Sequence, residues 1–339
     1  MTKTEKNYLE SIRLLGGQLK QAFKEAGKLK LPKAYGSVSK VVVCGMGGSQ
    51  LGADLVGSLF SKEVKLPVIQ VRDYNLPGFV DSKTLTFLVS YSGATEEVLE
   101  AGRKAKQAKA KMVVIASGSK LAALAKRNNW PLYKFEPINN PSGQPRMGIG
   151  YIAGGLLAVL KKLGKATISI NQINQLNSSV AANFEKYTRK AFANQLARKL
   201  IGKIPIIVSA EHLLGNAHIM ANQFHESAKQ IALYFPLPEL NHHLLEGLTF
   251  PKVNRQNLYF LFFYSADYHP RNQKRFKITQ EVLAKQKIKY QHLEFAGDKL
   301  EQSSEMLVLG SLLSYYLAKI NRVDPNRVPW VNYLKRRLK

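Results

Sequence analysis

Three hydroxyl side chains surround one glycine in the segment 90–96, which has the sequence Ser-Tyr-Ser-Gly-Ala-Thr-Glu. The apolar run before this segment is typical of a buried strand, and the residues after it favour a helix. Ser90, Ser92 and Thr95 are therefore expected beside the free N–H groups of a helix N-terminus, where an anion is stabilised. Phosphate is the anion whose geometry can use three hydroxyls, so the segment predicts a phosphate-binding turn.

A second turn of this kind, Gly-Met-Gly-Gly-Ser at 45–49, follows another apolar strand pattern. Gln50 stands where a dinucleotide fingerprint requires its third glycine, and Ala-Asp at 53–54 replaces the Lys-Ser/Thr of a nucleotide-binding P-loop. Nucleotide cofactors are therefore not expected. A close backbone approach at Gly47 and Gly48 and the hydroxyl of Ser49 remain as binding features. A tight turn without a ligand is the alternative, and the hydroxyl-rich turn in the same sheet disfavours it.

Glu226 lies in a segment, 212–230, whose apolar side chains recur at helical spacing. The expected core stripe consists of Leu213, Ala217, Met220, Phe224, Ala228 and Ile231. The opposite face is polar, which by itself indicates a solvated surface. The sequence His-Glu-Ser-Ala-Lys at 225–229 is similar to a zinc-protease motif, but Lys229 stands in place of the second histidine ligand, so no metal site is predicted. Glu226 is a candidate for proton transfer.

Two histidines, His242 and His243, follow Pro238 in a segment with the character of a loop. Histidine titrates near neutral pH and can move a proton to or from an oxygen. His242 is therefore a second candidate for proton chemistry. An ordinary surface histidine is the alternative for either residue taken alone.

Alternating strand and helix patterns must position these residues. Strands are expected at 39–44, 66–71, 84–90, 111–116, 131–135, 204–209, 231–236, 256–264 and 288–294. Helices are expected at 4–27, 49–60, 95–110, 120–128, 147–163, 171–200, 212–230, 270–286 and 303–320. The alternation predicts an α/β protein with two subdomains, each a parallel sheet flanked by helices in the doubly wound, flavodoxin-like arrangement. Both hydroxyl-bearing turns follow strand carboxyl ends, where such sheets bind ligands.

The expected domain organisation has four parts. They are an N-terminal helical segment 1–38, a first subdomain 39–150, linking helices 151–202, and a second subdomain 203–339 with a C-terminal helix and tail. The two halves share an order of elements but not a sequence, which distinguishes them from the units of a repeat array.

The composition is that of a globular protein. Hydrophobic residues make up 45% of the 339 residues, and the single cysteine, Cys44, allows no disulfide within the chain. Neither a signal-peptide core nor an apolar run of membrane-spanning length is recognised. A cytoplasmic protein without a membrane partner is therefore expected.

The net charge of +27 is unusual and attracts anionic partners. The basic residues are spread through the expected helices, with a denser group at 335–339. No zinc finger, helix-turn-helix or aromatic RNA-binding motif accompanies them. A basic solvated surface is the favoured interpretation, with no specific nucleic-acid partner, and nonspecific binding to nucleic acid stays open.

Four motifs in order resemble the bifunctional phosphoglucose/phosphomannose isomerase family, which is built from two sugar isomerase (SIS) domains. They are Gly-Met-Gly-Gly-Ser at 45–49, Ser-Tyr-Ser-Gly-Ala-Thr-Glu at 90–96, Asn-Gln-Phe-His-Glu-Ser-Ala-Lys at 222–229 and Glu-Leu-Asn-His at 239–242. The second motif marks SIS domains generally, whereas the last two together are specific to this isomerase branch.

The resemblance implies an aldose–ketose isomerase that interconverts glucose 6-phosphate, and also mannose 6-phosphate, with fructose 6-phosphate. The substrate phosphate would be held by Gly48 and by the hydroxyls of Ser49, Ser90, Ser92 and Thr95. Glu226 matches the family base, which moves a proton between C2 and C1 through a cis-enediol. Neither metal nor nucleotide is implied.

Three further residues match family positions. His242 matches a histidine that assists ring opening and that the family brings in from the neighbouring subunit, so a homodimer is implied. Arg146 matches an arginine near the reacting oxygens, and Lys335 matches a C-terminal lysine associated with the ring oxygen.

The sequence also departs from the family pattern. His225 replaces the usual Asn before the base, His243-Leu244 replaces Asn-Glu after the histidine, and Gln50-Leu51 replaces Ala-Ile in the first turn. These changes motivate an alternative, a non-catalytic SIS-domain protein that binds a sugar phosphate and regulates.

Overall fold

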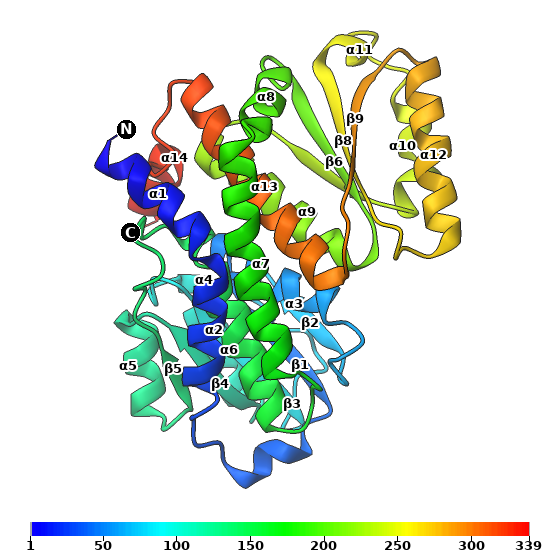
Figure 1. Ribbon diagram of the computed structural model, residues 1–339. Helices are drawn as coiled ribbons and strands as arrows, with labels where there is room; N and C mark the ends of the chain where they lie inside the picture. The colour runs from blue at the N-terminus through cyan, green and yellow to red at the C-terminus, as the bar shows by residue number, and fades with distance from the viewer. Residues whose placement is uncertain (1, 339) are drawn as a thin grey trace. The chain divides into compact units, whose positions relative to one another are not determined.

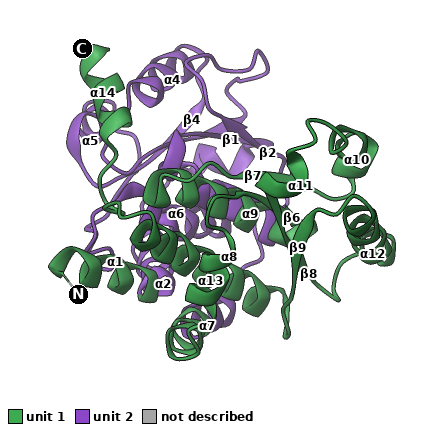
Figure 2. Cartoon of the chain, turned by 90° about the horizontal axis from the view of Figure 1, so that it is seen from above, with its two compact units in different colours: residues 1–13, 179–339 green, residues 14–178 purple. Residues whose placement is uncertain are grey.

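The computed structural model describes residues 2–338 and divides into two compact units, shown in different colours in Figure 2. One unit, residues Leu14–Ser178, is called here the first unit; the other, Met1–Arg13 with Ser179–Lys339, is called the second unit. Within residues 2–338, no helix has the length and apolar character needed to cross a membrane.

The first unit contains a five-stranded parallel sheet with the strand order β2-β1-β3-β4-β5. Its strands are β1 (Lys40–Cys44), β2 (Val68–Val71), β3 (Thr84–Ser90), β4 (Lys111–Ala116) and β5 (Leu132–Lys134). The chain turns outward in opposite directions from β1 and β3, so their carboxyl ends flank a topological switch point.

Helices cover both faces of this sheet (Figure 1). They are α2 (Leu15–Ala26), α3 (Leu51–Leu59), α4 (Glu96–Gln107), α5 (Ser119–Arg127) and α6 (Ile149–Lys162), with short 3₁₀ turns η1 (Lys33–Ser37), η2 (Gly47–Ser49) and η3 (Pro145–Met147). Buried Val98 of α4 and Leu121 of α5 share one core with Val114 of β4. On the opposite face, Gly155 of α6 lies against Ile115 of β4.

The second unit contains a four-stranded parallel sheet with the order β7-β6-β8-β9. Its strands are β6 (Ile204–Ser209), β7 (Leu233–Pro236), β8 (Leu258–Tyr264) and β9 (Lys289–Glu294). The order repeats that of the first four strands of the other sheet, so each unit has the doubly wound arrangement. The predicted α/β class with two parallel sheets is confirmed.

The second unit also contains helices, which are labelled in Figure 1. They are α1 (Lys3–Arg13), α8 (Phe192–Lys199), α9 (Leu214–Gln223), α10 (Leu244–Gly247), α11 (Asn254–Asn257), α12 (Pro270–Lys285), α13 (Lys299–Ile320) and α14 (Pro329–Arg337), with the short turns η4 (Glu211–Leu213), η5 (Phe224–Ala228) and η6 (Glu239–His242). The boundary between the units falls within α7 (Ile170–Arg189).

Several expected helices differ in their bounds. Segment 4–27 is two helices that meet at Leu14, next to two glycines of low helix propensity. Segment 171–200 divides at Ala191, whose φ of 51° is left-handed. Helix α13 begins four residues earlier than expected because Asp298 and Glu301 form a capping box.

Segment 212–230 differs most from the prediction. The regular helix α9 ends at Gln223, and the next five residues form a π-helical turn. The chain then leaves the helix at Lys229, which has a left-handed φ of 52°. Five residues of the predicted core stripe are buried, but Ile231 is 58% exposed because it lies beyond this break.

Candidate active site

The turn after β3 is organised by its own hydroxyls. The oxygens Ser90 Oγ and Thr95 Oγ1 lie 2.8 Å apart, Gly93 N donates to Ser90 Oγ (3.0 Å), and Ala94 N donates to Ser92 Oγ (3.3 Å). Thr95 is the N-cap residue of α4, but its side chain makes no capping hydrogen bond to that helix. The first N–H groups of α4 are therefore left for another acceptor, as an anion site requires.

Gly93 makes this turn possible. Its φ of 69° is left-handed, and a Cβ at this position would overlap the carbonyl oxygen of Gly118. Both the backbone conformation and the close approach of the neighbouring loop therefore require glycine. Leu121 N of α5 also donates to Gly93 O (2.8 Å), so both neighbouring helices fix the turn.

The turn after β1 is joined to this one. Tyr91 N donates to Ser49 Oγ (2.8 Å), which links η2 to the β3 turn by a buried hydrogen bond. Gly48 lies against η3, where a Cβ would be 2.5 Å from Arg146 N. Gly48, Ser49 and the β3 turn thus meet at the switch point of the first sheet.

The backbone of Arg146 lies beside Gly48. This residue is 0% exposed and lies on η3, and its Nη1 donates to Gln144 Oε1 (3.2 Å). Burial of a guanidinium strengthens its electrostatic effect on nearby oxygens, because water screens it less. The structure therefore brings together the six candidates that lie in the first unit: Gly48, Ser49, Ser90, Ser92, Thr95 and Arg146.

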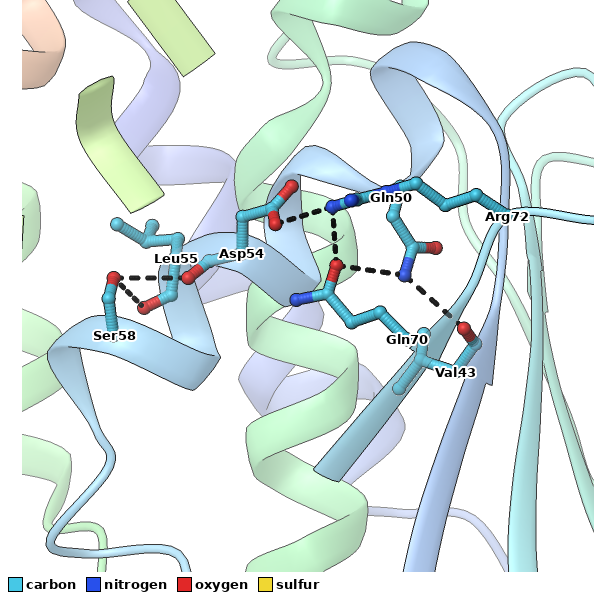
Figure 3. A network of polar contacts seen from close by, with 7 residues as sticks. All are labelled: Val43, Gln50, Asp54, Leu55, Ser58, Gln70 and Arg72. Atoms are coloured by element: carbon cyan, nitrogen blue, oxygen red, sulfur yellow. Dashed lines mark hydrogen bonds and ion pairs between the residues drawn. The ribbon is translucent and has the colours of Figure 1, made fainter. Parts of the chain in front are cut away.

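Gln50, a departure from the family pattern, anchors a polar network behind the first turn (Figure 3). Its Nε2 donates to Val43 O and to Gln70 Oε1, both at 3.2 Å. Arg72 Nη2 donates to Gln70 Oε1 and to Asp54 Oδ1, both at 2.6 Å. Gln50 thus connects β1, β2 and α3 and holds η2 in place.

Cys44 lies one residue before this turn, and its thiol is expected to be unreactive. It is 1% exposed, and burial raises its pKa to about 12. A thiol with this pKa is almost fully protonated at neutral pH and is a poor nucleophile.

Glu226 lies on the π-helical turn η5 of the second unit and is half-buried. π-Helical turns are rare, and many of those known lie at functional sites. The turn thus sets Glu226 apart from the residues of the regular helix α9.

Hydrogen bonds from three side chains hold the chain around Glu226 in place. Tyr8 on α1 donates to Ser227 Oγ (2.6 Å), and Asn321 at the end of α13 donates to Ala228 O (3.0 Å). Lys229 Nζ donates to Glu226 O (2.9 Å), Ser227 O (3.2 Å) and Asp324 O (2.6 Å). We call this arrangement of the Lys229 ammonium over the last carbonyls the lysine cap.

His225, the residue before Glu226, binds the chain that leads to the candidate histidine loop. Its Nε2 lies 2.7 Å from Ala232 O, and His218 on α9 stacks on Tyr234 of β7 with ring centroids 4.8 Å apart. The departure from Asn at position 225 therefore has a structural task, which is to fasten the π-helical turn to the start of β7.

His242 ends η6, in the loop after β7, and its side chain is exposed. The preceding residue fixes this loop, because Asn241 Nδ2 donates to Thr279 Oγ1 on α12 (2.8 Å) and Arg275 donates to Asn241 Oδ1 (3.2 Å). The ring of His243 lies 6.3 Å from that of Phe235. His243, which departs from the family pattern, thus packs against Phe235 of β7.

Lys335 is exposed on α14, a helix with no buried residue among those described. Glu226, His242 and Lys335 all belong to the second unit, and their catalytic roles stay predictions. No sequence pattern indicated Tyr8 or Asn321, whose contacts with the π-helical turn join residues more than ninety positions apart. Within residues 2–338, no cluster of three or more His, Cys, Asp or Glu side chains could hold a metal ion.

The two sheets and the hydroxyl-lined switch point define the class of this protein as the α/β SIS-domain fold. A solved structure of the same fold is the C-terminal domain of glucosamine-fructose-6-phosphate aminotransferase from Francisella tularensis, with a TM-score of 0.72, 16% identity, and coverage of 95% of this chain and 98% of that one. The family model described as "Bacterial phospho-glucose isomerase C-terminal SIS domain" matches residues 189–338.

Sequence relatives narrow the class. The bifunctional phosphoglucose/phosphomannose isomerase of Caldicellulosiruptor bescii is 32% identical over 340 residues, which covers 97% of this chain and 98% of that protein. The chain belongs to the bifunctional phosphoglucose/phosphomannose isomerase family. The D-glucosamine-6-phosphate 4-epimerase of Sulfolobus acidocaldarius is 31% identical over 214 residues, covering 62% of this chain and 64% of that protein.

Proposed function

We propose that this protein interconverts glucose 6-phosphate and mannose 6-phosphate with fructose 6-phosphate. The observation that carries the proposal is the hydroxyl-lined turn at the start of α4, which offers a phosphate both side-chain hydroxyls and uncapped helix N–H groups. Family membership supports the same activity.

In this proposal the turns after β1 and β3 hold the phosphate end of the substrate, which does not react. The hydroxyls of Ser49, Ser90, Ser92 and Thr95 bind the phosphate oxygens, and Gly48 lets the backbone approach. Binding energy from this inert group then orients C1 and C2, which lowers the entropic cost of reaching the transition state.

Glu226 acts as the base in the proposed reaction. Its carboxylate removes the proton from C2 of the open-chain aldose, and the C2–H electrons form the C1=C2 bond of a cis-enediol while the carbonyl oxygen gains a proton. Return of a proton to C1, with loss of the proton on the C2 hydroxyl, leaves the ketose. Because the enediol has no stereochemistry at C2, the same base serves both epimeric aldoses.

Three further residues assist in the proposed mechanism. His242 moves a proton during ring opening, Lys335 acts at the ring oxygen, and the Arg146 guanidinium stabilises negative charge on the enediolate. The proposal includes a homodimer in which His242 reaches the site of the neighbouring subunit. It also includes a cytoplasmic location, which agrees with a single cysteine that is buried.

The direct test is turnover of purified protein on each hexose 6-phosphate, measured by coupling product formation to a dehydrogenase. Wild type is expected to convert both aldoses, and Glu226→Gln is expected to lose about 10³-fold or more of the rate because it removes the base. Full activity of Glu226→Gln, or no turnover of either aldose by wild type, refutes the proposal.

The epimerase relative makes a second sugar phosphate worth testing. Glucosamine 6-phosphate belongs in the same assay series, with the products identified by NMR.

A non-catalytic protein that binds sugar phosphates is the alternative motivated by residues 243–244. It predicts thermal stabilisation by hexose 6-phosphates without any turnover.

A further inference from the structure

A groove of about 570 Å³ runs between α4 and α5 in the first unit. Its rim carries four basic side chains, Arg103 and Lys106 from α4 with Lys120 and Arg127 from α5. Its remaining lining is Leu99, Ala123, Leu124, Asn128 and Trp130. The volume is in the range of small-molecule sites, which is roughly 300–1,000 Å³.

The charge of this groove is positive on both walls, and no carboxylate is among its lining residues. Arg103 is paired with Glu100, and Lys106 Nζ donates to Asn128 Oδ1 (2.6 Å). The side chains of Lys120 and Arg127 form no hydrogen bond or ion pair with any residue in the range 2–338. Lys120 and Arg127 on α5 thus have no counter-charge within this range, and a bound polyanion would supply one.

The floor of the groove is apolar and partly aromatic. Leu99, Leu124 and Trp130 are half-buried and pack against the core beneath α4 and α5. An indole at the edge of the core offers a flat surface on which a ring system stacks. A ligand that uses both features has a planar ring and several negative charges.

We propose that the α4–α5 groove is a second binding site that takes a nucleoside polyphosphate. Its base packs on Trp130 and the leucines, and its phosphates contact Lys120, Arg127 and the basic side chains of α4. This binding goes beyond the proposed isomerase function and does not depend on it.

The groove is connected to the phosphate turn by the two helices that form it. Thr95 of that turn is the N-cap residue of α4, and Leu121 N of α5 donates to Gly93 O of the turn (2.8 Å). A polyanion that draws the two helices together therefore stabilises the turn in the present geometry. Binding in the groove and at the turn is expected to be mutually reinforcing, and this coupling, unlike the site itself, rests on the proposed function.

The chain contains two tryptophans, so Trp330→Phe leaves Trp130 as the single reporter in the groove. Trp330 is 80% exposed, and its replacement is expected to leave the fold intact. ATP without divalent metal is titrated at 0.15 M salt while Trp130 fluorescence is recorded. Saturable quenching is expected, with a Kd at least tenfold lower than for adenosine alone or for inorganic tripolyphosphate alone.

Charge reversal on the groove distinguishes this site from general attraction to a basic protein. Lys120→Glu with Arg127→Glu is expected to weaken ATP binding at least tenfold. The matched control, Lys277→Glu with Lys285→Glu on α12, makes the same change in net charge at exposed positions elsewhere and is expected to leave the Kd within twofold. Melting curves of both double variants check that the fold is kept.

Three results overturn the proposal: no saturable quenching, tripolyphosphate binding as tightly as ATP, or equal effects of the two double variants. The coupling is tested by repeating the titration with saturating glucose 6-phosphate. A Kd for ATP at least threefold lower supports it, and an unchanged or higher Kd refutes it. Calorimetry of glucose 6-phosphate alone separates that result from a failure of the proposed function, because absence of binding there contradicts the phosphate turn itself.

Discussion

At the scale of single residues, the most informative group is the lysine cap. Lys229 places a positive charge against the carbonyl oxygens that end the π-helical turn, where the helix dipole is negative. The same ammonium reaches Asp324 O, so one side chain joins the end of the turn to the segment after α13. The position of the Glu226 backbone depends on this contact.

Lys229→Met tests this dependence. We expect kcat to fall about tenfold to a hundredfold with little change in KM, because the base loses its alignment while the phosphate turn is intact. Lys229→Arg, which keeps a charged donor, is expected to recover part of the loss. Lys285→Met, an exposed change on α12, is the control. A rise in KM for Lys229→Met with an unchanged kcat contradicts the assignment.

At the scale of elements, the turns between strands and helices carry the candidate chemistry. Their positions could be predicted from sequence, because an apolar run followed by glycine and hydroxyl residues is typical of a strand that ends in a turn. The π-helical turn could not be predicted, because residues 213–228 keep the apolar spacing of an ordinary helix. Its supports Tyr8 and Asn321 also gave no local signal, because each contact joins distant parts of the chain.

Gly93→Ala tests whether the turn after β3 requires glycine at this position. We expect a lower free energy of unfolding, by about 2 kcal/mol or more, because the variant combines a left-handed φ with overlap on the Gly118 carbonyl. Gly143→Ala is the matched control: its φ of 67° is similar, but no atom lies within 4 Å of its Cβ position. In urea unfolding, equal losses for the two variants contradict the steric part of the argument.

At the scale of the whole molecule, stability is expected to depend on pH through His212. Burial lowers the pKa of this imidazole below its ordinary value of 6.5, although Gln302 Oε1 lies 2.8 Å from its Nε2. Below pH 6.5 the unfolded chain therefore binds more protons than the folded one, and stability falls as the pH falls through this range.

The measurement is the melting temperature between pH 7.5 and pH 5. We expect wild type to lose stability on acidification and His212→Gln, which keeps a donor near Gln302, to lose less over the same interval. A wild-type melting temperature that is flat across this range, or an identical slope in the variant, contradicts the assignment to His212.

The class of fold, with two parallel sheets, could also be predicted at this scale, since strand and helix patterns alternate along the whole chain. The net charge of +27 by itself said little about function, because it does not say where on the molecule the basic residues gather. The structure gives part of that charge a position, on the two walls of the α4–α5 groove.

Isomerisation in D₂O shows whether Glu226 moves a proton between C2 and C1 of a hexose 6-phosphate, as we propose. NMR of the fructose 6-phosphate formed from glucose 6-phosphate is expected to show deuterium at C1, because the proton held by the carboxyl group exchanges with solvent. Glu226→Gln is expected to form neither product nor deuterated substrate. Product without deuterium at C1, formed at a rate that Glu226→Gln does not change, would contradict the claim.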